Sequence, residues 1–159
     1  MKKIIALIVL IMTLNSCAEK IVINREVDST EYGKMLLGTQ SFDQFHKEPY
    51  KVWFDKNYKI YPTDKPSIEA LKKAKINSYS ITVFLGTWCG DSKRNFPRLM
   101  KILDETKFPK SKLHIIGVNR KKQSPNGEEA KYNIVKVPTI ILEKYGKEIG
   151  RITEEPETG

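Results

Sequence analysis

The sequence predicts an α/β protein in which helices pack on a central mixed sheet of four strands. The run Ile81–Leu85 is short, apolar and rich in β-branched and aromatic residues, which is typical of a buried strand. Helical periodicity follows it, and two further apolar runs come later, at Leu113–Val118 and Ile140–Leu142. An order of strand, helix, strand, short helix, strand and strand favours layers of helices on a mixed sheet.

The first residues are typical of a secretory signal. Lys2 and Lys3 form a basic start, and Ile4–Leu14 is an almost unbroken apolar run of 11 residues. A helix that spans a bilayer needs about 20 such residues. We therefore predict that residues 1–16 are a signal peptide and that residues 17–29, which show little periodicity, are a tether.

Residues 30–77 are predicted to form a helical extension in front of the main domain. The stretch Ser41–Phe54 mixes apolar and charged residues in a way that suits a helix, with a break or restart at Pro49. Pro66 fits the first turn of another helix, because its missing N–H has no helical partner at that position.

Residues 78–159 are predicted to form the main domain. After the first strand, the apolar residues of Phe96–Leu103 fall on one face of a helix. The polar loop Asn119–Gly127 and a short helical piece lead from the second strand to the third. A turn around Gly146 then leads into a fourth strand, Glu148–Thr153.

The charge and the histidines exclude some classes of function. The net charge is +9, but the positive residues are scattered and form no arginine-rich stripe with interleaved aromatic residues, so nucleic-acid binding has little support. The two histidines, His46 and His114, lie apart with no cysteine or carboxylate cluster, so we predict no metal site and no cofactor. His114, inside an apolar strand, is interpreted as a hydrogen-bonded core residue.

The chain has two cysteines, Cys17 and Cys89. Cys89 lies between the predicted first strand and the predicted helix, in the sequence Trp88-Cys89-Gly90-Asp91-Ser92. A Cys-x-x-Cys pair would have its second sulfur at position 92, where this chain has serine. A dithiol pair closes and opens its own disulfide, whereas a single thiol forms a disulfide only with a second molecule.

These residues resemble the thioredoxin superfamily. In that family a Trp-Cys-Gly-x-Cys motif ends a strand and opens a helix, and a proline follows five positions after the second cysteine, as Pro97 follows Ser92 here. A second proline, in a cis peptide bond, faces the active cysteine from the start of a later strand, and Pro138 matches it. The resemblance is firm over residues 78–153. More narrowly, Gly86–Arg94 resembles the thioredoxin-like lipoproteins of Bacteroidetes-type bacteria.

The chain departs from that family in two ways. Ser92 replaces the resolving cysteine, and the chain ends at Gly159, where the family has a last helix that covers one face of the sheet. Either the sequence is truncated there or the N-terminal extension covers that face.

The resemblance also implies roles for individual residues. Cys89 is the expected nucleophile, with active-site support from Trp88, Gly90, Asp91, Ser92 and Pro138. Near the N-terminus, Leu14-Asn15-Ser16-Cys17 resembles the lipobox of bacterial lipoproteins. It implies a lipid on Cys17, an anchor in the bacterial cell envelope and a domain that faces the periplasm. The alternative is simple cleavage near Ala18, which leaves Cys17 as a spare thiol.

A single thiol at a helix N-terminus favours one kind of chemistry. The unpaired N–H groups of the first turn favour the thiolate of Cys89, which is the nucleophilic form, and Ser92 is placed to donate a hydrogen bond to it. The thiolate would attack a protein or small-molecule disulfide, and an external thiol must then release the product. This scheme suits an isomerase, or a reductase that an external thiol resolves.

Three other interpretations stay open. In the first, the chain is a redox-silent binding module that keeps the fold without turnover. In the second, Cys89 is a small buried apolar residue. Monothiol glutaredoxins use a similar Cys-Gly-x-Ser motif to hold iron–sulfur clusters with glutathione, but an exported lipoprotein is a poor setting for that task.

Overall fold

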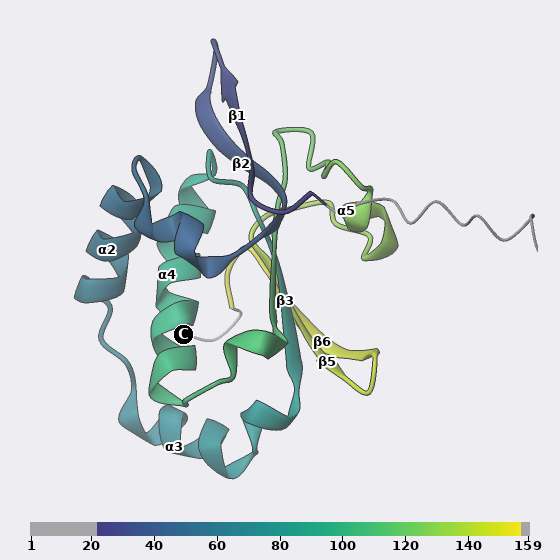
Figure 1. The fold of residues 1–159 in the computed structure, drawn as a ribbon. Helices are drawn as coiled ribbons and strands as arrows, with labels where there is room; N and C mark the ends of the chain where they lie inside the picture. Colours follow the sequence, from purple (N-terminus) through teal and green to yellow (C-terminus); the bar gives the residue numbers. More distant parts are fainter. Residues whose placement is uncertain (1–21, 157–159) are drawn as a thin grey trace, which may run out of the picture.

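One sheet of six strands organises the protein, for which a computed structural model describes residues 22–156 (Figure 1). The order across the sheet is β1-β2-β4-β3-β5-β6. Strands β3 and β4 run parallel, and every other neighbouring pair in this sheet is antiparallel. The α/β class and the mixed sheet are confirmed, but the sheet has six strands where four were predicted. The strands are β1 (Arg25–Ser29), β2 (Gly33–Gln40), β3 (Ser80–Leu85), β4 (Leu113–Gly117), β5 (Thr139–Lys144) and β6 (Lys147–Thr153).

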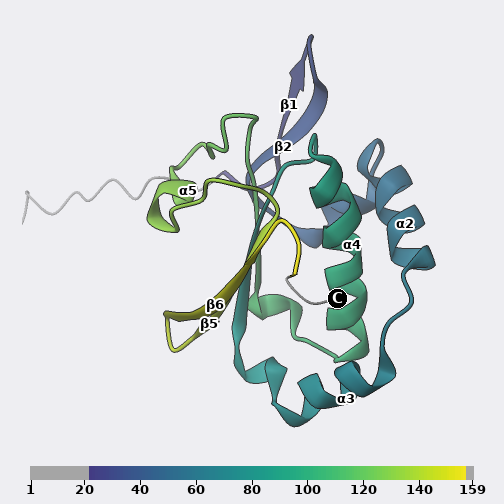
Figure 2. The same cartoon turned by 180° about the vertical axis from the view of Figure 1, so that it is seen from behind.

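Helices lie on both faces of the sheet. Figures 1 and 2 show α2 and α4 together on one face and the short α5 on the other. The α-helices are α2 (Tyr50–Ile60), α3 (Lys65–Lys73), α4 (Gly90–Glu105) and α5 (Glu128–Lys131). The 3₁₀ turns are η1 (Phe42–His46), η2 (Ile76–Ser78) and η3 (Lys110–Lys112).

The hairpin β1–β2 corrects two sequence predictions. Residues 25–29 were assigned to a tether and residues 33–40 to a helical extension, yet both are strands. Non-local pairing explains the difference, because β2 lies alongside β4, with Thr39 opposite Ile116. Gly33 and Gly38 have φ angles of +68° and +72°, which glycine adopts without steric cost. The projecting hairpin is seen above the body of the protein in Figure 1.

The rest of the extension is helical and packs against α4. Helix α2 begins directly after Pro49, and Pro66 lies in the first turn of α3, as the sequence predicts. Phe45 of η1 is fully buried, with its ring centroid 4.6 Å from that of Phe96 on α4. The extension and the main domain therefore share one hydrophobic core. Its buried residues are Leu36, Phe45, Tyr50, Phe54, Ile81, Val83, Leu85, Phe96, Met100, Leu103, Phe108 and Ile115.

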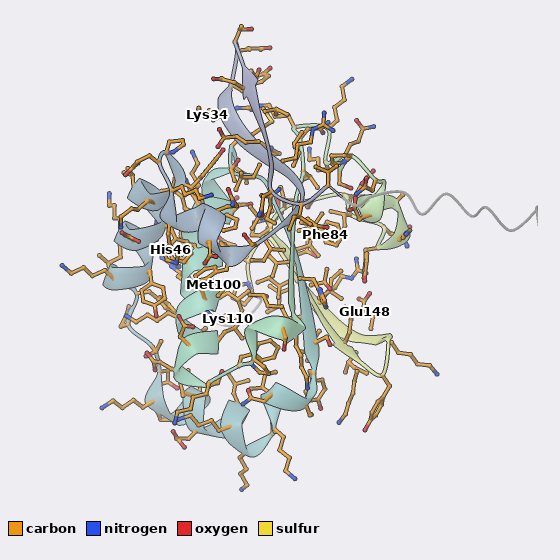
Figure 3. The ribbon with its side chains drawn as sticks, in the orientation of Figure 1. Lys34, His46, Phe84, Met100, Lys110 and Glu148 are labelled. Carbon is orange, nitrogen blue, oxygen red and sulfur yellow. The ribbon has the colours of Figure 1, made fainter. Side chains whose placement is uncertain are left out.

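A second, smaller core lies on the other face of the sheet. It contains Phe84, Ile116, Val118, Ile134, Val137 and Ile141, and Trp88, Cys89 and Tyr132 pack against it. Figure 3 shows Phe84 and Met100 inside the body of the protein, whereas Lys34 and Glu148 lie out on the two hairpins. Cys89 is thus at the border of this second core.

The extension covers α4 but leaves part of the same sheet face open. A cavity of about 390 Å³ lies between α4 and the β5–β6 hairpin. Its lining includes Leu99 and Ile102 of α4 and Ile140, Leu142 and Ile152 of the hairpin. Leu71 of α3 and Ile76 of η2 line the same cavity, so the extension packs on α4 and also borders this open part of the face.

His114 is exposed, so the prediction that it is a core residue is wrong. Side chains alternate along a strand, and its neighbour Ile115 is the one that enters the large core. His114 instead lines a cavity of about 460 Å³ on the opposite face, with Thr82, Tyr132 and Glu143.

Candidate active site at the N-terminus of α4

The site begins where the central strand β3 ends. β3 lies between β4 and β5, and all of its residues after Ser80 are buried. Cys89 is the N-cap residue of α4, with φ −87° and ψ 129°, and its amide donates a hydrogen bond to the Gly86 carbonyl at 2.9 Å. The thiol therefore lies at the N-terminal end of a helix of 16 residues, where unpaired N–H groups favour an anion.

The structure brings Cys89 and Pro138 together. The partly buried Cys89 Sγ donates a hydrogen bond to the Val137 carbonyl at 3.4 Å. The peptide bond between Val137 and Pro138 is cis. Thr139, directly after it, begins β5 and pairs with Phe84. The proline segment is thus positioned by the same strand that leads to Cys89.

Trp88 forms one wall of the site. Its indole Nε1 donates a hydrogen bond to the Val118 carbonyl at 2.8 Å. The ring folds back over Gly86, where an added Cβ would lie only 2.5 Å from Trp88 Cε2. Gly86 is therefore needed for this position of the indole ring.

Ser92 and Asp91 do not contact the thiol through hydrogen bonds. Ser92 is fully buried, and its Oγ accepts a hydrogen bond from the Gly86 amide at 3.2 Å. The expected bond from Ser92 to Cys89 is thus replaced by one to the backbone. Asp91 forms an ion pair with Arg94, at 2.9 Å between Oδ1 and Nη2. Gly90, the first residue of α4, is exposed.

The end of the described chain borders the site on one side. Glu155 pairs with Arg94, and Asn95 Nδ2 donates to the Glu154 carbonyl at 2.8 Å. The Glu154 carboxylate lies 2.7 Å from Lys136 Nζ, and this hydrogen bond raises the pKa of Lys136. Carboxylates therefore balance two cations near the Cys89–Pro138 pair.

Sequence reasoning missed three residues that surround the site. Thr87 Oγ1 accepts a hydrogen bond from the Leu36 amide of β2 at 3.3 Å, which ties the hairpin to the active-site loop. The Arg120 guanidinium lies over two rings, 5.2 Å from the centroid of Trp88 and 4.0 Å from that of Tyr32. Arg120 stood in the sequence only as part of a basic run, and no local signal links it to Tyr32.

The described residues show neither a metal-binding cluster nor a membrane-spanning helix. Residues 22–156 contain no group of three or more His, Cys, Asp or Glu side chains that could hold a metal ion. No helix in the same range is long and apolar enough to cross a bilayer. Cys17 and the predicted signal peptide lie outside the described residues.

Comparison with known proteins identifies the family. The sequence model of the family named Thioredoxin matches residues 68–158, and the chain belongs to this family. The match spans β3, the Cys89 motif, α4 and the Pro138 segment, and it confirms the thioredoxin-like fold class.

Two similar solved structures share the fold at low sequence identity. A protein of unknown function from Pseudomonas aeruginosa is 15% identical, with a TM-score of 0.56, and the match covers 76% of this chain and 75% of that one. An HIV epitope-scaffold protein is 16% identical, with a TM-score of 0.54 and coverage of 74% and 73%. Mitochondrial thioredoxin 3 of Saccharomyces cerevisiae is 24% identical, with a TM-score of 0.38 and coverage of 63% and 90%. No curated protein matches the chain.

Proposed function

We propose that this protein carries out thiol–disulfide exchange with Cys89 as its single nucleophile. The observation that carries the proposal is the position of the Cys89 thiol. Cys89 is the N-cap residue of α4, and its partly exposed sulfur lies 3.4 Å from the Val137 carbonyl oxygen, which precedes Pro138. A helix N-terminus favours the thiolate, which is the form that attacks a disulfide.

The reaction conserves electrons without a cofactor. The Cys89 thiolate attacks one sulfur of a substrate disulfide, a new S–S bond forms to Cys89, and the other substrate sulfur leaves as a thiolate with the electron pair. A second thiolate from outside then attacks the mixed disulfide and returns Cys89 to its reduced state. Buried Ser92 has no sulfur to do this from within. The scheme therefore supports an isomerase, or a reductase that an external thiol resolves.

Mass spectrometry of the intact protein tests the proposal. In the full-length Cys17→Ser variant, held in detergent, Cys89 is the only thiol. Incubation with glutathione disulfide should add one glutathione, and an added thiol should remove it. The double variant Cys17→Ser/Cys89→Ser, which has no thiol, is the matched control and should gain nothing.

The alkylation rate of native Cys89 is the second measurement. Cys89 should react in the folded protein, because its side chain is partly exposed at the N-terminus of α4. Reaction only after unfolding would contradict the proposal and identify Cys89 as a buried structural residue. Alkylation in the folded protein, with no glutathione adduct, would favour the redox-silent binding module.

We also propose that Cys17 carries a lipid that anchors the domain to the bacterial cell envelope, facing the periplasm. The proposal is supported by the apolar run Ile4–Leu14 and the lipobox-like Leu14-Asn15-Ser16-Cys17, and by the likeness of Gly86–Arg94 to thioredoxin-like lipoproteins. The protein purified from bacterial membranes should begin at Cys17 and carry added acyl mass. A mature chain with an unmodified Cys17, or one cleaved near Ala18, would overturn the anchor and leave the exchange chemistry untouched.

A further inference from the structure

We infer that Arg120, held between Tyr32 and Trp88, forms a subsite for a carboxylate, so that Cys89 acts preferentially on disulfides with a carboxylate close to the reacting sulfur. The inference rests on the proposed exchange chemistry and adds the substrate class. It depends on how Arg120 is held, on the lack of a partner for its N–H donors among residues 22–156, and on its contact with Trp88, the residue before Cys89.

The backbone of Arg120 is held in a tight turn. Val118, two residues earlier, accepts the hydrogen bond from the Trp88 indole at 2.8 Å. The Asn119 side chain accepts from the amides of Lys121 and Gln123, at 2.8 and 3.0 Å. The Asn119 amide and the Gln123 carbonyl close the same turn at 2.9 Å. The turn therefore positions Arg120 relative to the wall of the active site.

The Arg120 side chain is held by two aromatic rings from different parts of the chain. Its guanidinium carbon lies 4.0 Å from the ring centroid of Tyr32 and 5.2 Å from that of Trp88. Tyr32 comes from the turn of the β1–β2 hairpin, which the Thr87–Leu36 hydrogen bond ties to the active-site loop. Guanidinium groups bind favourably over aromatic faces, so the hairpin restrains a side chain that would otherwise be mobile.

The N–H donors of Arg120 have no protein partner among the residues that the structure describes. Within residues 22–156, Arg120 donates no hydrogen bond to a protein acceptor and has no carboxylate partner within the 4.0 Å of an ion pair, although Arg94 and Lys136 are both paired. Lys121 and Lys122, which follow it, also lack such partners in that range and add positive charge. A guanidinium fork matches a carboxylate in geometry and charge, and fixing it beforehand lowers the entropic cost of binding.

The position of Arg120 links this charge to the thiol. Trp88, whose ring Arg120 covers, directly precedes Cys89. A disulfide that approaches Cys89 along the Trp88 wall brings its neighbouring groups toward Arg120. A carboxylate there is attracted both before and during the exchange, whereas a cationic group is repelled. Small anionic disulfides and acidic segments of proteins share this chemistry.

The test compares disulfide probes of different charge. Dithiobis(nitrobenzoate) has a carboxylate on each ring, dithiodipyridine is neutral and cystamine is cationic. The second-order rate constant with Cys89 is measured in the full-length Cys17→Ser protein. For each probe, the rate constant of this protein is divided by that of the same protein with Arg120→Gln. The intrinsic reactivity of the probe cancels in this ratio.

Arg120→Gln should lower the rate with the anionic probe by roughly three- to tenfold, leave the neutral probe within about twofold and raise the rate with cystamine. Raising the ionic strength to about 0.5 M should remove most of the difference, because exposed charges are then screened. Tyr32→Ala should have a smaller effect in the same direction. Lys73→Gln, which removes an exposed charge on α3, is the matched control and should change none of the ratios. An acidic peptide and its amidated form, each linked through a disulfide, distinguish a protein segment from a small molecule as the source of the carboxylate.

Two results would overturn the subsite. Equal loss with all three probes would mean that Arg120 only supports the position of Trp88, and no loss with the anionic probe would mean that it has no role in recognition. Arg120→Lys keeps the charge without the fork and should retain part of the preference, which separates a folding defect from a loss of charge. A failure of Cys89 to react with any probe would overturn the exchange chemistry itself and this assignment with it.

Discussion

The Ser92 hydroxyl oxygen lies 3.2 Å from the Gly86 amide nitrogen and accepts its hydrogen bond inside the protein. Both residues are buried, so this bond joins the end of the β3 segment to the first turn of α4. Position 92 therefore supports the backbone around Cys89 through a contact that does not involve the thiol.

Replacing Ser92 with cysteine should convert the site from one thiol to two. In Ser92→Cys the new sulfur lies one helical turn after Cys89, so it can attack a mixed disulfide on Cys89 from within the chain. Release of a glutathione adduct should then proceed without added thiol, as intact mass would show. Ser92→Ala is the control: it should still need external thiol and should unfold about 1–3 kcal/mol more easily, because the buried Gly86 amide loses its acceptor. An adduct on Ser92→Cys that persists without added thiol would contradict the prediction.

Gly86→Ala should displace Trp88. The added Cβ would lie 2.5 Å from Trp88 Cε2, so the indole must move away from Val118. We expect a loss of roughly 1–3 kcal/mol in the free energy of unfolding and a shift of the Trp88 fluorescence. Trp53→Phe removes the second tryptophan signal. Gly90→Ala is matched, since its Cβ would meet no atom within 4 Å, and it should be close to neutral. If Gly86→Ala and Gly90→Ala had similar effects, a clash with Trp88 could not be the cause.

Phe45→Ala should destabilise the whole protein rather than the extension alone. Phe45 is fully buried, with its ring centroid 4.6 Å from that of Phe96 on α4. Removing a buried phenylalanine costs about 3–5 kcal/mol, and Val52→Ala, at a side chain that is 65% exposed, should cost far less. Urea unfolding, followed by fluorescence and by circular dichroism, should give one transition at the same concentration. Separate transitions would show that the extension unfolds independently.

Asp64 should contribute to stability in a pH-dependent way. Its carboxylate caps α3, and the hydrogen bonds from the Ser67 hydroxyl and amide hold its pKa below the ordinary value of 3.8. A lowered pKa in the folded state means that the contribution is complete above the ordinary value and is lost as the pH falls through the folded value. Between about pH 5 and pH 2, Asp64→Asn should therefore lose less stability than the unchanged protein. The thermal unfolding midpoints of the two proteins are compared across this pH range. Midpoints that fall in parallel would contradict the prediction.

The sequence predicted the parts of the fold whose signal is local. The apolar run of β3, the helical face of α4 and the helix starts at Pro49 and Pro66 each follow from a few adjacent residues. The β1–β2 hairpin does not, because β2 is stabilised by its partner β4, more than seventy residues later. His114 was misassigned because an apolar stretch does not show which face of the sheet remains uncovered.

The candidate site also has features that the sequence predicted and features that it did not. The motif around Cys89 and the later Pro138 were expected to meet because the chain resembles a known family, and the structure brings them together. The contacts of Arg120 with Tyr32 and Trp88 depend on the hairpin, so they could not be expected without it. Ser92 was recognised as the missing sulfur, but its hydrogen bond to Gly86 became visible only from the turn geometry.

Gly117 offers a way to recognise relatives that carry the same N-terminal hairpin. A Cβ at this position of β4 would lie 2.2 Å from the Leu36 carbonyl oxygen, so β2 can pack there only against a residue without a side chain. In a homologous sequence, glycine at this place would be compatible with an added strand, and any larger residue would argue that the sheet ends at β4. The residue at the position of Gly117 thus indicates whether a relative has the β1–β2 hairpin, although the two lie in different halves of the chain.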